Sequence, residues 1–214
     1  MESVDYFCSL HGSKSECFDE IKDSANVVSN GGIIIYPTDT LYGLGADIRN
    51  EESLLRIYDI KGRPNDMALP VLVSGWEMVR SISSEVNVSG EKLAARFWPG
   101  QLTLVIRAND NLSTILTGGR RTIAVRQPAH WIAQQIIEQV GNPIVGTSAN
   151  LSGSPDLVEA SDLVAELGDL VDRIITCGLK PFGVGSTVVD ITGEQPKLLR
   201  ETSISIEDIQ SALG

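Results

Sequence analysis

The sequence predicts an α/β fold in which a single twisted sheet of parallel and antiparallel strands is flanked by helices. Segments with helical periodicity and short apolar segments typical of strands are interleaved along the chain, and some are joined by short turns. The chain has 214 residues, 42% of them hydrophobic and 21% charged. Such a length and composition suit one sizeable globular domain, or at most two small ones.

The first half of the chain alternates between the two kinds of element. Apolar residues at helical spacing or in short runs predict helices over 16–29, 51–60 and 91–98 and strands over 33–35, 69–73 and 102–106. Gly31-Gly32 ends the first helix and Pro99-Gly100 ends the third, because glycine and proline interrupt helical structure at these points.

The second half continues in the same manner. Its predicted elements are a strand over 122–126, a helix over 130–140, a strand over 143–147, a helix over 161–167, and strands over 174–176, 187–191 and 197–200. Ser161 is the predicted N-cap of the helix over 161–167, and the last two strands pair across a turn that contains Gly193. Ser205 and Asp208 form a predicted capping box that starts a final helix.

Composition and charge exclude several classes of protein. No apolar run approaches the ~20 residues of a membrane span, and the acidic N-terminus lacks the features of a signal peptide. Three cysteines are too few for a disulfide framework and favour a reducing compartment, so we expect a cytoplasmic protein. The net charge of −11 disfavours strong direct binding to nucleic acid.

Cys8, His11 and Cys17 lie close together near the N-terminus. Their spacing matches no standard zinc pattern, and no second pair of ligands follows. We therefore expect unligated thiols in an N-terminal arm and no metal held by protein side chains. The chain also lacks the G-x-G-x-x-G and G-x-x-x-x-G-K-[ST] signatures of common nucleotide-binding sites.

The stretch from Ile35 to Gly45 is the first candidate binding segment. A buried strand changes abruptly into proline, hydroxyl side chains and glycines, a composition that neither packs a core nor extends a sheet. Such a turn places side chains and backbone N–H groups at the end of a strand, where α/β proteins bind ligands. The alternative is an ordinary exit from strand to loop.

Lys61-Gly62-Arg63-Pro64 places two cations near the end of the second predicted helix. If the segment is extended, as a residue before proline tends to be, both side chains project alike and suit a triphosphate or a carboxylate. The alternative is a solvated helix end whose cations interact with the helix dipole.

Two further turns and two arginines complete the candidate set. Residues 147–153 offer hydroxyls, an amide and a glycine for an anion or a ribose, and residues 183–187 could form a backbone cradle. Arg126 and Arg200 each stand at the end of a predicted strand. The alternatives are a capped loop, an ordinary glycine-rich turn and surface charges. The two histidines show no base–nucleophile pattern.

Together and in this order, these segments resemble the YrdC-like family, and specifically its single-domain threonylcarbamoyl-AMP synthases. The matching residues are Tyr36 to Gly45, Lys61 to Pro64, Trp98-Pro99-Gly100 with Thr103, Ala124 to Arg126 with Pro128, Thr147 to Gly153, Ser186 to Asp190, and Leu199-Arg200. The resemblance implies one YrdC-like domain over residues 1–214, with a core of about 17–204, no further C-terminal domain and a concave cationic cleft.

The resemblance implies that L-threonine, bicarbonate and ATP are converted to threonylcarbamoyl-AMP and pyrophosphate, the first step in forming threonylcarbamoyl-adenosine in tRNA. Carboxylate, carbamate and triphosphate must then share one cavity, which requires convergent cations and Mg²⁺. A partner enzyme would transfer the threonylcarbamoyl group to tRNA. The acidic charge adds the expectation of weak or no direct tRNA binding.

The resemblance also implies roles for individual residues. The catalytic core would be Lys61, Arg63, Ser148 and Asn150. The ATP contacts would be Lys61, Arg63, Met67, Thr122, Asn150 and Arg200, and the threonine contacts Thr40, Arg126, Ser148 and Ser186. Arg126 would clamp the threonine carboxylate, and Lys61 or a bound water would take the ammonium proton.

The chain departs from the family pattern in several places. Met67-Ala68-Leu69 replaces the usual Asn-Pro-Leu, so only a backbone contact is expected at Met67, and Leu72 stands where some members have histidine. Asp156-Leu157-Val158 and Glu201-Thr202-Ser203 replace a Pro-Thr continuation and a glycine-containing turn. A paralogue for another carbamoyl or nucleotide substrate therefore stays open. An RNA-binding or ribosome-maturation module on the same fold is the other alternative.

Overall fold

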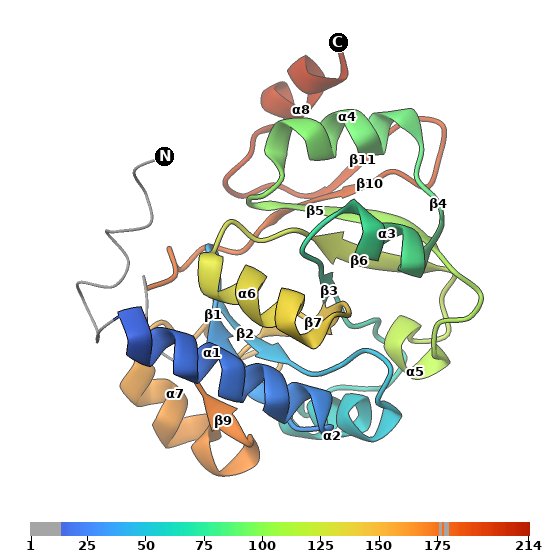
Figure 1. Ribbon diagram of the computed structural model, residues 1–214. Coiled ribbons are helices and arrows are strands. Elements are labelled where there is room, and N and C mark those ends of the chain that lie inside the picture. Colours follow the sequence, from blue (N-terminus) through green and yellow to red (C-terminus); the bar gives the residue numbers. More distant parts are fainter. Residues whose placement is uncertain (1–13, 176, 178–179) are drawn as a thin grey trace.

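The computed structural model describes residues 14–175, 177 and 180–214 (Figure 1). Its helices are α1 (Lys14–Ser29), α2 (Glu51–Lys61), α3 (Trp76–Ile82), α4 (Val88–Phe97), α5 (Thr114–Thr117), α6 (Trp131–Val140), α7 (Ala160–Leu167) and α8 (Ile206–Leu213), with a 3-10 turn at Gly168–Leu170. Its strands are β1 (Ile34–Pro37), β2 (Tyr42–Gly45), β3 (Val71–Leu72), β4 (Ser83–Glu85), β5 (Leu102–Ala108), β6 (Thr122–Arg126), β7 (Ile144–Val145), β8 (Thr147–Ser148), β9 (Arg173–Ile174), β10 (Thr187–Asp190) and β11 (Lys197–Arg200). Cys8, His11 and Thr176, for which the sequence carries predictions, lie outside the described residues.

The described strands form two mixed sheets where the sequence predicts one. The larger sheet has seven strands, in the order β11-β10-β5-β6-β3-β7 with β4 beside β5, and the smaller sheet has four, in the order β8-β2-β1-β9. β5 runs antiparallel to β6 and parallel to β10, while β1 runs antiparallel to β2 and parallel to β9. The predicted class, mixed strands flanked by helices, is confirmed (Figure 1).

A single segment passes from one sheet to the other. β7 pairs with β3 of the larger sheet, and β8 pairs with β2 of the smaller sheet. Between them, the N–H of Gly146 donates to the carbonyl of Pro70 at 2.8 Å. A Cβ at Gly146 would stand 2.3 Å from Cγ of Leu72, so the crossing requires glycine. The predicted strand over 143–147 is therefore split into two.

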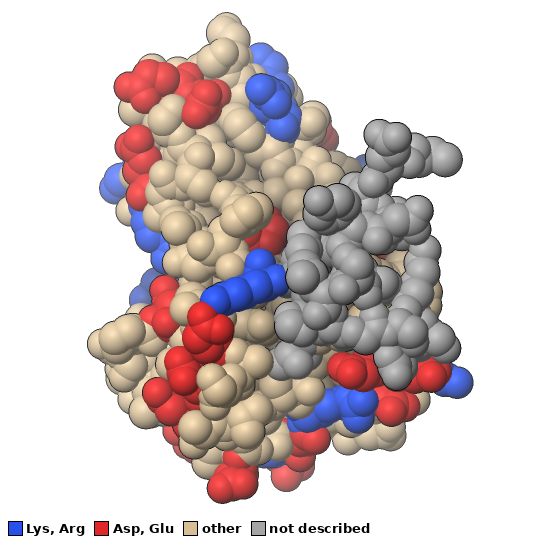
Figure 2. Space-filling model, turned by 90° about the vertical axis from the view of Figure 1, so that its left-hand side faces the viewer, with Lys and Arg blue, Asp and Glu red and all other residues tan. Residues whose placement is uncertain are grey.

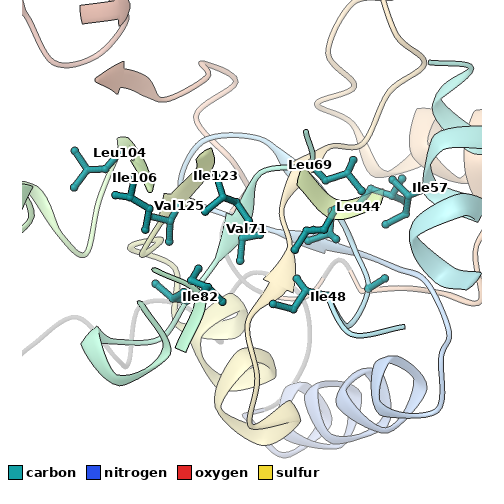
Figure 3. Close-up of a cluster of buried hydrophobic side chains, with 14 of the residues drawn as sticks. Leu44, Ile48, Ile57, Leu69, Val71, Ile82, Leu104, Ile106, Ile123 and Val125 are labelled. Atoms are coloured by element: carbon teal, nitrogen blue, oxygen red, sulfur yellow. The ribbon is translucent and has the colours of Figure 1, made fainter. Parts of the chain in front are cut away.

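Both sheets contribute to one hydrophobic core. Leu104 and Val125 of the larger sheet lie in the same buried cluster as Leu44 of the smaller sheet and Ile57 of α2 (Figure 3). A second cluster lies where α1 and α6 run side by side, and it includes Tyr36 of β1 (Figure 1). Burying one such aliphatic side chain stabilises a fold by about 1.5–3 kcal/mol. The shared core thus fixes how the two sheets meet.

The helix starts follow the predicted pattern with one exception. Asn50 caps α2, and Ser205 with Asp208 forms the predicted capping box of α8. The prediction of Ser161 as an N-cap is wrong, because Glu159 holds that position in α7. Because α7 begins at Ala160, Ser161 lies inside the helix, and its hydroxyl is not at the position from which an N-cap side chain accepts a backbone N–H. None of the described helices has the length and apolar character needed to cross a bilayer.

The prediction for the stretch after β1 is wrong in one respect. Tyr42–Gly45 forms a buried strand between β1 and β8, so this stretch does extend a sheet. The ring of Tyr36 lies against its glycines: a Cβ at Gly45 would be 2.6 Å from Cε1 of Tyr36. Glycine in a strand often marks such a close approach. Here it allows β2 to pair with a strand that carries a buried aromatic ring.

Candidate active site

A cavity of about 470 Å³ is lined by residues of both sheets. Six of the ten residues predicted for the site line it: Thr40, Arg63, Arg126, Ser148, Ser186 and Arg200. Lys61 and Asn150 are buried and contact Ser148, whereas Met67 and Thr122 are not among the lining residues. The structure therefore brings together eight of the ten, from segments far apart in the sequence.

The charges that line the cavity are unequal. Three arginines line it, Arg63, Arg126 and Arg200, but only one carboxylate, Asp156. The whole chain is acidic, with a net charge of −11, and Figure 2 shows one face on which Lys and Arg are interspersed with Asp and Glu. Converging guanidinium groups suit phosphate and carboxylate ligands, so the cavity has the character of an anion site.

Lys61 is a buried cation whose hydrogen bonds are all made within the protein. Its Nζ donates to the carbonyls of Ser148 at 2.6 Å and Asn150 at 2.9 Å and to Asn150 Oδ1 at 3.1 Å. Ser148 Oγ donates to the same Oδ1 at 2.8 Å. Burial and the neighbouring Arg63 lower the pKa of Lys61 to about 8, and Asp156 opposes them. The three residues form one hydrogen-bonded polar cluster, and Ser148 of this cluster lines the cavity.

The position of Lys61 differs from both sequence interpretations. Lys61 is the last residue of α2, and Gly62 follows as a left-handed C-cap with φ 59°. The segment is therefore not extended, because a glycine C-cap turns the chain sharply. Lys61 is also not a solvated helix end, since only 4% of it is exposed.

Arg63 leaves this turn in another direction. Its Nη2 donates to the carbonyls of Met67 at 2.8 Å and Ala68 at 2.7 Å, and its guanidinium lies 5.5 Å from the ring centre of Tyr58. The Tyr58 hydroxyl also donates to the Met67 carbonyl, at 2.6 Å. The Met67 carbonyl is thus already occupied, while its side chain is exposed.

Arg126 reaches from the end of β6 to the turn after β1. Its Nη1 donates to Asp39 Oδ1 at 2.6 Å, and its Nη2 donates to Thr40 Oγ1 at 3.0 Å and Thr38 Oγ1 at 3.3 Å. Sequence reasoning did not assign Asp39 or Thr38 to the site. Their position in the hydroxyl-rich candidate segment 35–45 is the sequence feature that could have indicated them.

Ser186 and Arg200 meet at the start of the β10–β11 hairpin. Ser186 Oγ lies 2.7 Å from Thr103 Oγ1 of β5, and Arg200 Nε donates to the Ser186 carbonyl at 2.9 Å. Thr103 also lines the cavity and was not predicted to do so. The parallel pairing of β10 with β5 brings these hydroxyls together.

Thr122 lies at the far end of β6 from Arg126. Side chains alternate along a strand, so Thr122, Ala124 and Arg126 share one face. Ala124 and Arg126 line the cavity, and Thr122 continues that face beyond it. A ligand long enough to leave the cavity in this direction would meet Thr122 next.

Comparison with known proteins identifies this arrangement. A model of the Sua5/YciO/YrdC family, described as "Telomere recombination", matches residues 26–202. The chain belongs to this family. The matched range contains every residue predicted for the site.

Curated members of the family share the sequence over most of this chain. The threonylcarbamoyl-AMP synthase of Pyrococcus abyssi is 38% identical over 195 residues, which cover 91% of this chain and 57% of that protein. That of Bacillus subtilis is 33% identical, covering 100% of this chain and 62% of the relative. The chain thus spans less than two thirds of these relatives. The putative threonylcarbamoyl-AMP synthase of Mycobacterium tuberculosis is 34% identical, covering 93% and 94%.

Solved structures of the family share the fold. Pyrococcus abyssi Sua5 complexed with L-threonine superposes with a TM-score of 0.86 at 38% identity, covering 91% of this chain and 57% of that one. Escherichia coli YciO superposes with a TM-score of 0.77 at 27% identity, covering 88% and 92%.

Proposed function

We propose that the chain is a threonylcarbamoyl-AMP synthase, which converts L-threonine, bicarbonate and ATP to threonylcarbamoyl-AMP and pyrophosphate. One observation carries this proposal: Arg63, Arg126, Arg200 and the Lys61–Ser148–Asn150 cluster converge on a single cavity between two sheets. Relatives with this name and a Pyrococcus abyssi structure that contains L-threonine support it.

We assign threonine to the end of the cavity at Arg126. The guanidinium group would bind the carboxylate, as Arg commonly does through paired N–H groups. Thr40, Ser148 and Ser186 would donate to or accept from the remaining polar groups of the amino acid. All four residues line the cavity, and Arg126 and Thr40 are already fixed against each other at 3.0 Å.

We assign the triphosphate to the end of the cavity at Arg63 and Arg200. Both arginines line the cavity, and their guanidinium groups donate to backbone carbonyls and pair with no described carboxylate. Asn150 and Lys61 would complete this subsite. Thr122, further along the face of β6, would contact the part of ATP that leaves the cavity. Met67 would contact ATP through its backbone N–H, which makes only a 3.4 Å bond to the Pro64 carbonyl, because its own carbonyl already accepts from Arg63 and Tyr58.

The chemistry follows from placing these anions together. The threonine nitrogen adds to the carbon derived from bicarbonate, and water leaves. The resulting carbamate oxygen attacks the α-phosphorus, the bond to the β-phosphate oxygen breaks, and pyrophosphate leaves. Cations held in advance stabilise the charge on the attacked phosphoryl group. The N–H bonds of Lys61 are engaged with oxygen acceptors, so we assign the proton from threonine to water and a charged, positioning role to Lys61.

Magnesium would enter with ATP as part of the substrate. Mg²⁺ in such sites binds phosphate oxygens and one or two carboxylates, and Asp156 is the carboxylate that lines the cavity. A separate enzyme would transfer the threonylcarbamoyl group to tRNA, and this chain would bind tRNA weakly or not at all. We place the reaction in the cytoplasm, in keeping with the low cysteine content.

Pyrophosphate release tests the proposal. The full chain with MgATP should release pyrophosphate only when both L-threonine and bicarbonate are present. Omitting each in turn, and replacing L-threonine with D-threonine, are the controls. Threonine-independent release, or none under any condition, would refute the proposed activity.

A further inference from the structure

A buried ion pair holds Arg126 at one end of the cavity. Only 7% of the Arg126 side chain and 6% of the Asp39 side chain are exposed, and their atoms Nη1 and Oδ1 are 2.6 Å apart. Gln101 Nε2 donates to the Asp39 carbonyl at 3.1 Å and so fixes the backbone of this residue. Thr38, Thr40 and Arg126 line the cavity, whereas Asp39 does not. Asp39 therefore acts on a ligand through Arg126 and through its own charge.

The Asp39 carboxylate balances the charge of Arg126 and of no other described group. Its second oxygen, Oδ2, is buried and accepts no hydrogen bond from the residues that the structure describes. Arg63 and Arg200 donate instead to backbone carbonyls. Among the residues that the structure describes, Arg126 is therefore the lining arginine that is hydrogen-bonded to a carboxylate.

A charge-balanced subsite distinguishes ligands by their ammonium group. A carboxylate bound at Arg126 brings its α-ammonium close to the guanidinium, which repels it. Asp39, in direct contact with that guanidinium, attracts the ammonium and offsets part of the repulsion. Without the Asp39 charge, only the repulsion would remain.

Building on the proposed function, we propose that Asp39 is a specificity-determining residue that makes the Arg126 end of the cavity select a zwitterionic amino acid over an anion of the same shape. It does so by balancing the Arg126 charge next to the bound ligand. Asp39 is thus a positioning residue: it orients Arg126 and balances its charge, and it does not itself contact the substrate.

Calorimetric binding of two ligands to the full chain tests this role. The ligands are L-threonine and 2,3-dihydroxybutanoate, in which a hydroxyl replaces the ammonium and the carboxylate is kept. The wild-type chain should bind threonine at least about tenfold more tightly than the hydroxy acid, and Asp39→Asn should lower that ratio about tenfold. A merely structural loss would weaken both ligands alike, because both place a carboxylate on Arg126.

Asp47→Asn is the matched control. It neutralises another buried carboxylate that pairs with an arginine, Arg49, at 2.7 Å and does not line the cavity. This variant should leave the ratio unchanged.

Three results would overturn the inference. One is an unchanged ratio in folded Asp39→Asn. Another is equal binding of the two ligands by the wild-type chain, a result that does not depend on whether any variant folds. In that case the proposed activity would still hold if threonine-dependent pyrophosphate release is seen. The third is binding of neither ligand, which removes the threonine subsite and with it the inference.

Discussion

At the scale of single residues, Arg126 links the stability of the fold to its proposed chemistry. Arg126→Ala leaves Asp39 buried without the partner that stands 2.6 Å from it. Breaking a buried pair from one side typically costs about 3–5 kcal/mol. Urea unfolding should show a loss of that order, and threonine-dependent pyrophosphate release should disappear.

The double variant Arg126→Ala with Asp39→Asn separates the two effects. It removes both charges, so it should recover much of the lost stability while remaining inactive. Equal stability of the single and double variants would contradict the role of the ion pair. Activity in either would contradict the assigned carboxylate contact.

The lowered pKa of Lys61 predicts opposite pH dependences for the stability of the fold and for the activity. Burial lowers its pKa from 10.5 to about 8 in the folded chain. Between these values the unfolded chain holds the proton and the folded chain does not, so the contribution of Lys61 to the free energy of unfolding rises with pH. A required positive charge would instead make kcat/KM fall as pH rises above about 8.

Lys61→Arg is the control, because guanidinium stays charged throughout this range. Its residual activity should show no decline near pH 8. The rate profile is measured by pyrophosphate release, and the ionisation of Lys61 by the pH dependence of its acetylation in the folded protein. A wild-type profile that is flat to about pH 10 would show that the Lys61 charge is not needed.

At the scale of elements, the β1–β2 hairpin depends on close approach of backbone to an aromatic ring. A Cβ at Gly45 would stand 2.6 Å from Tyr36, whose ring is fully buried and whose hydroxyl donates to the Val145 carbonyl at 3.0 Å. The ring cannot move aside without losing this bond. Gly45→Ala should therefore lower the free energy of unfolding by about 2 kcal/mol.

Gly75→Ala serves as the comparison. A Cβ there meets nothing within 4 Å, and the residue has an extended φ of 173°. Gly75 is the N-cap of α3, where alanine is less favourable than glycine, so thermal or urea unfolding should show a loss of no more than about 1 kcal/mol. Similar losses in the two variants would mean that packing against Tyr36 is not what Gly45 provides.

Elements with strong local signals were predictable from the sequence. The periodic helices α1, α2 and α6, the pairing of β10 with β11 and the capping box of α8 are confirmed. The glycines of β2 are interpreted from the sequence as part of a turn. Their role is to make room for the ring of Tyr36 on the neighbouring strand, and that contact depends on a strand pairing that the sequence does not show. The burial of Lys61 could not be predicted from the sequence either, because its hydrogen-bond partners Ser148 and Asn150 are distant in sequence.

At the scale of the whole molecule, the net charge limits which partners bind directly. A charge of −11 opposes a phosphate backbone, and the arginines of the cavity are too few to form an extended basic face. We expect no shift of tRNA in a gel at about 150 mM salt and only weak, salt-sensitive binding at lower salt. A tight shift that persists at high salt would favour the RNA-binding alternative.

The meeting of the two sheets is the feature on which the proposed function depends. Arg126 of the larger sheet contacts Thr40 beside the smaller one, and the chain crosses between the sheets at Gly146. The most direct test is a crystal structure of the chain with L-threonine and a non-hydrolysable ATP analogue. We predict the threonine carboxylate on Arg126 and the triphosphate against Arg63 and Arg200 in one cavity. Either ligand bound elsewhere on the protein would contradict the account.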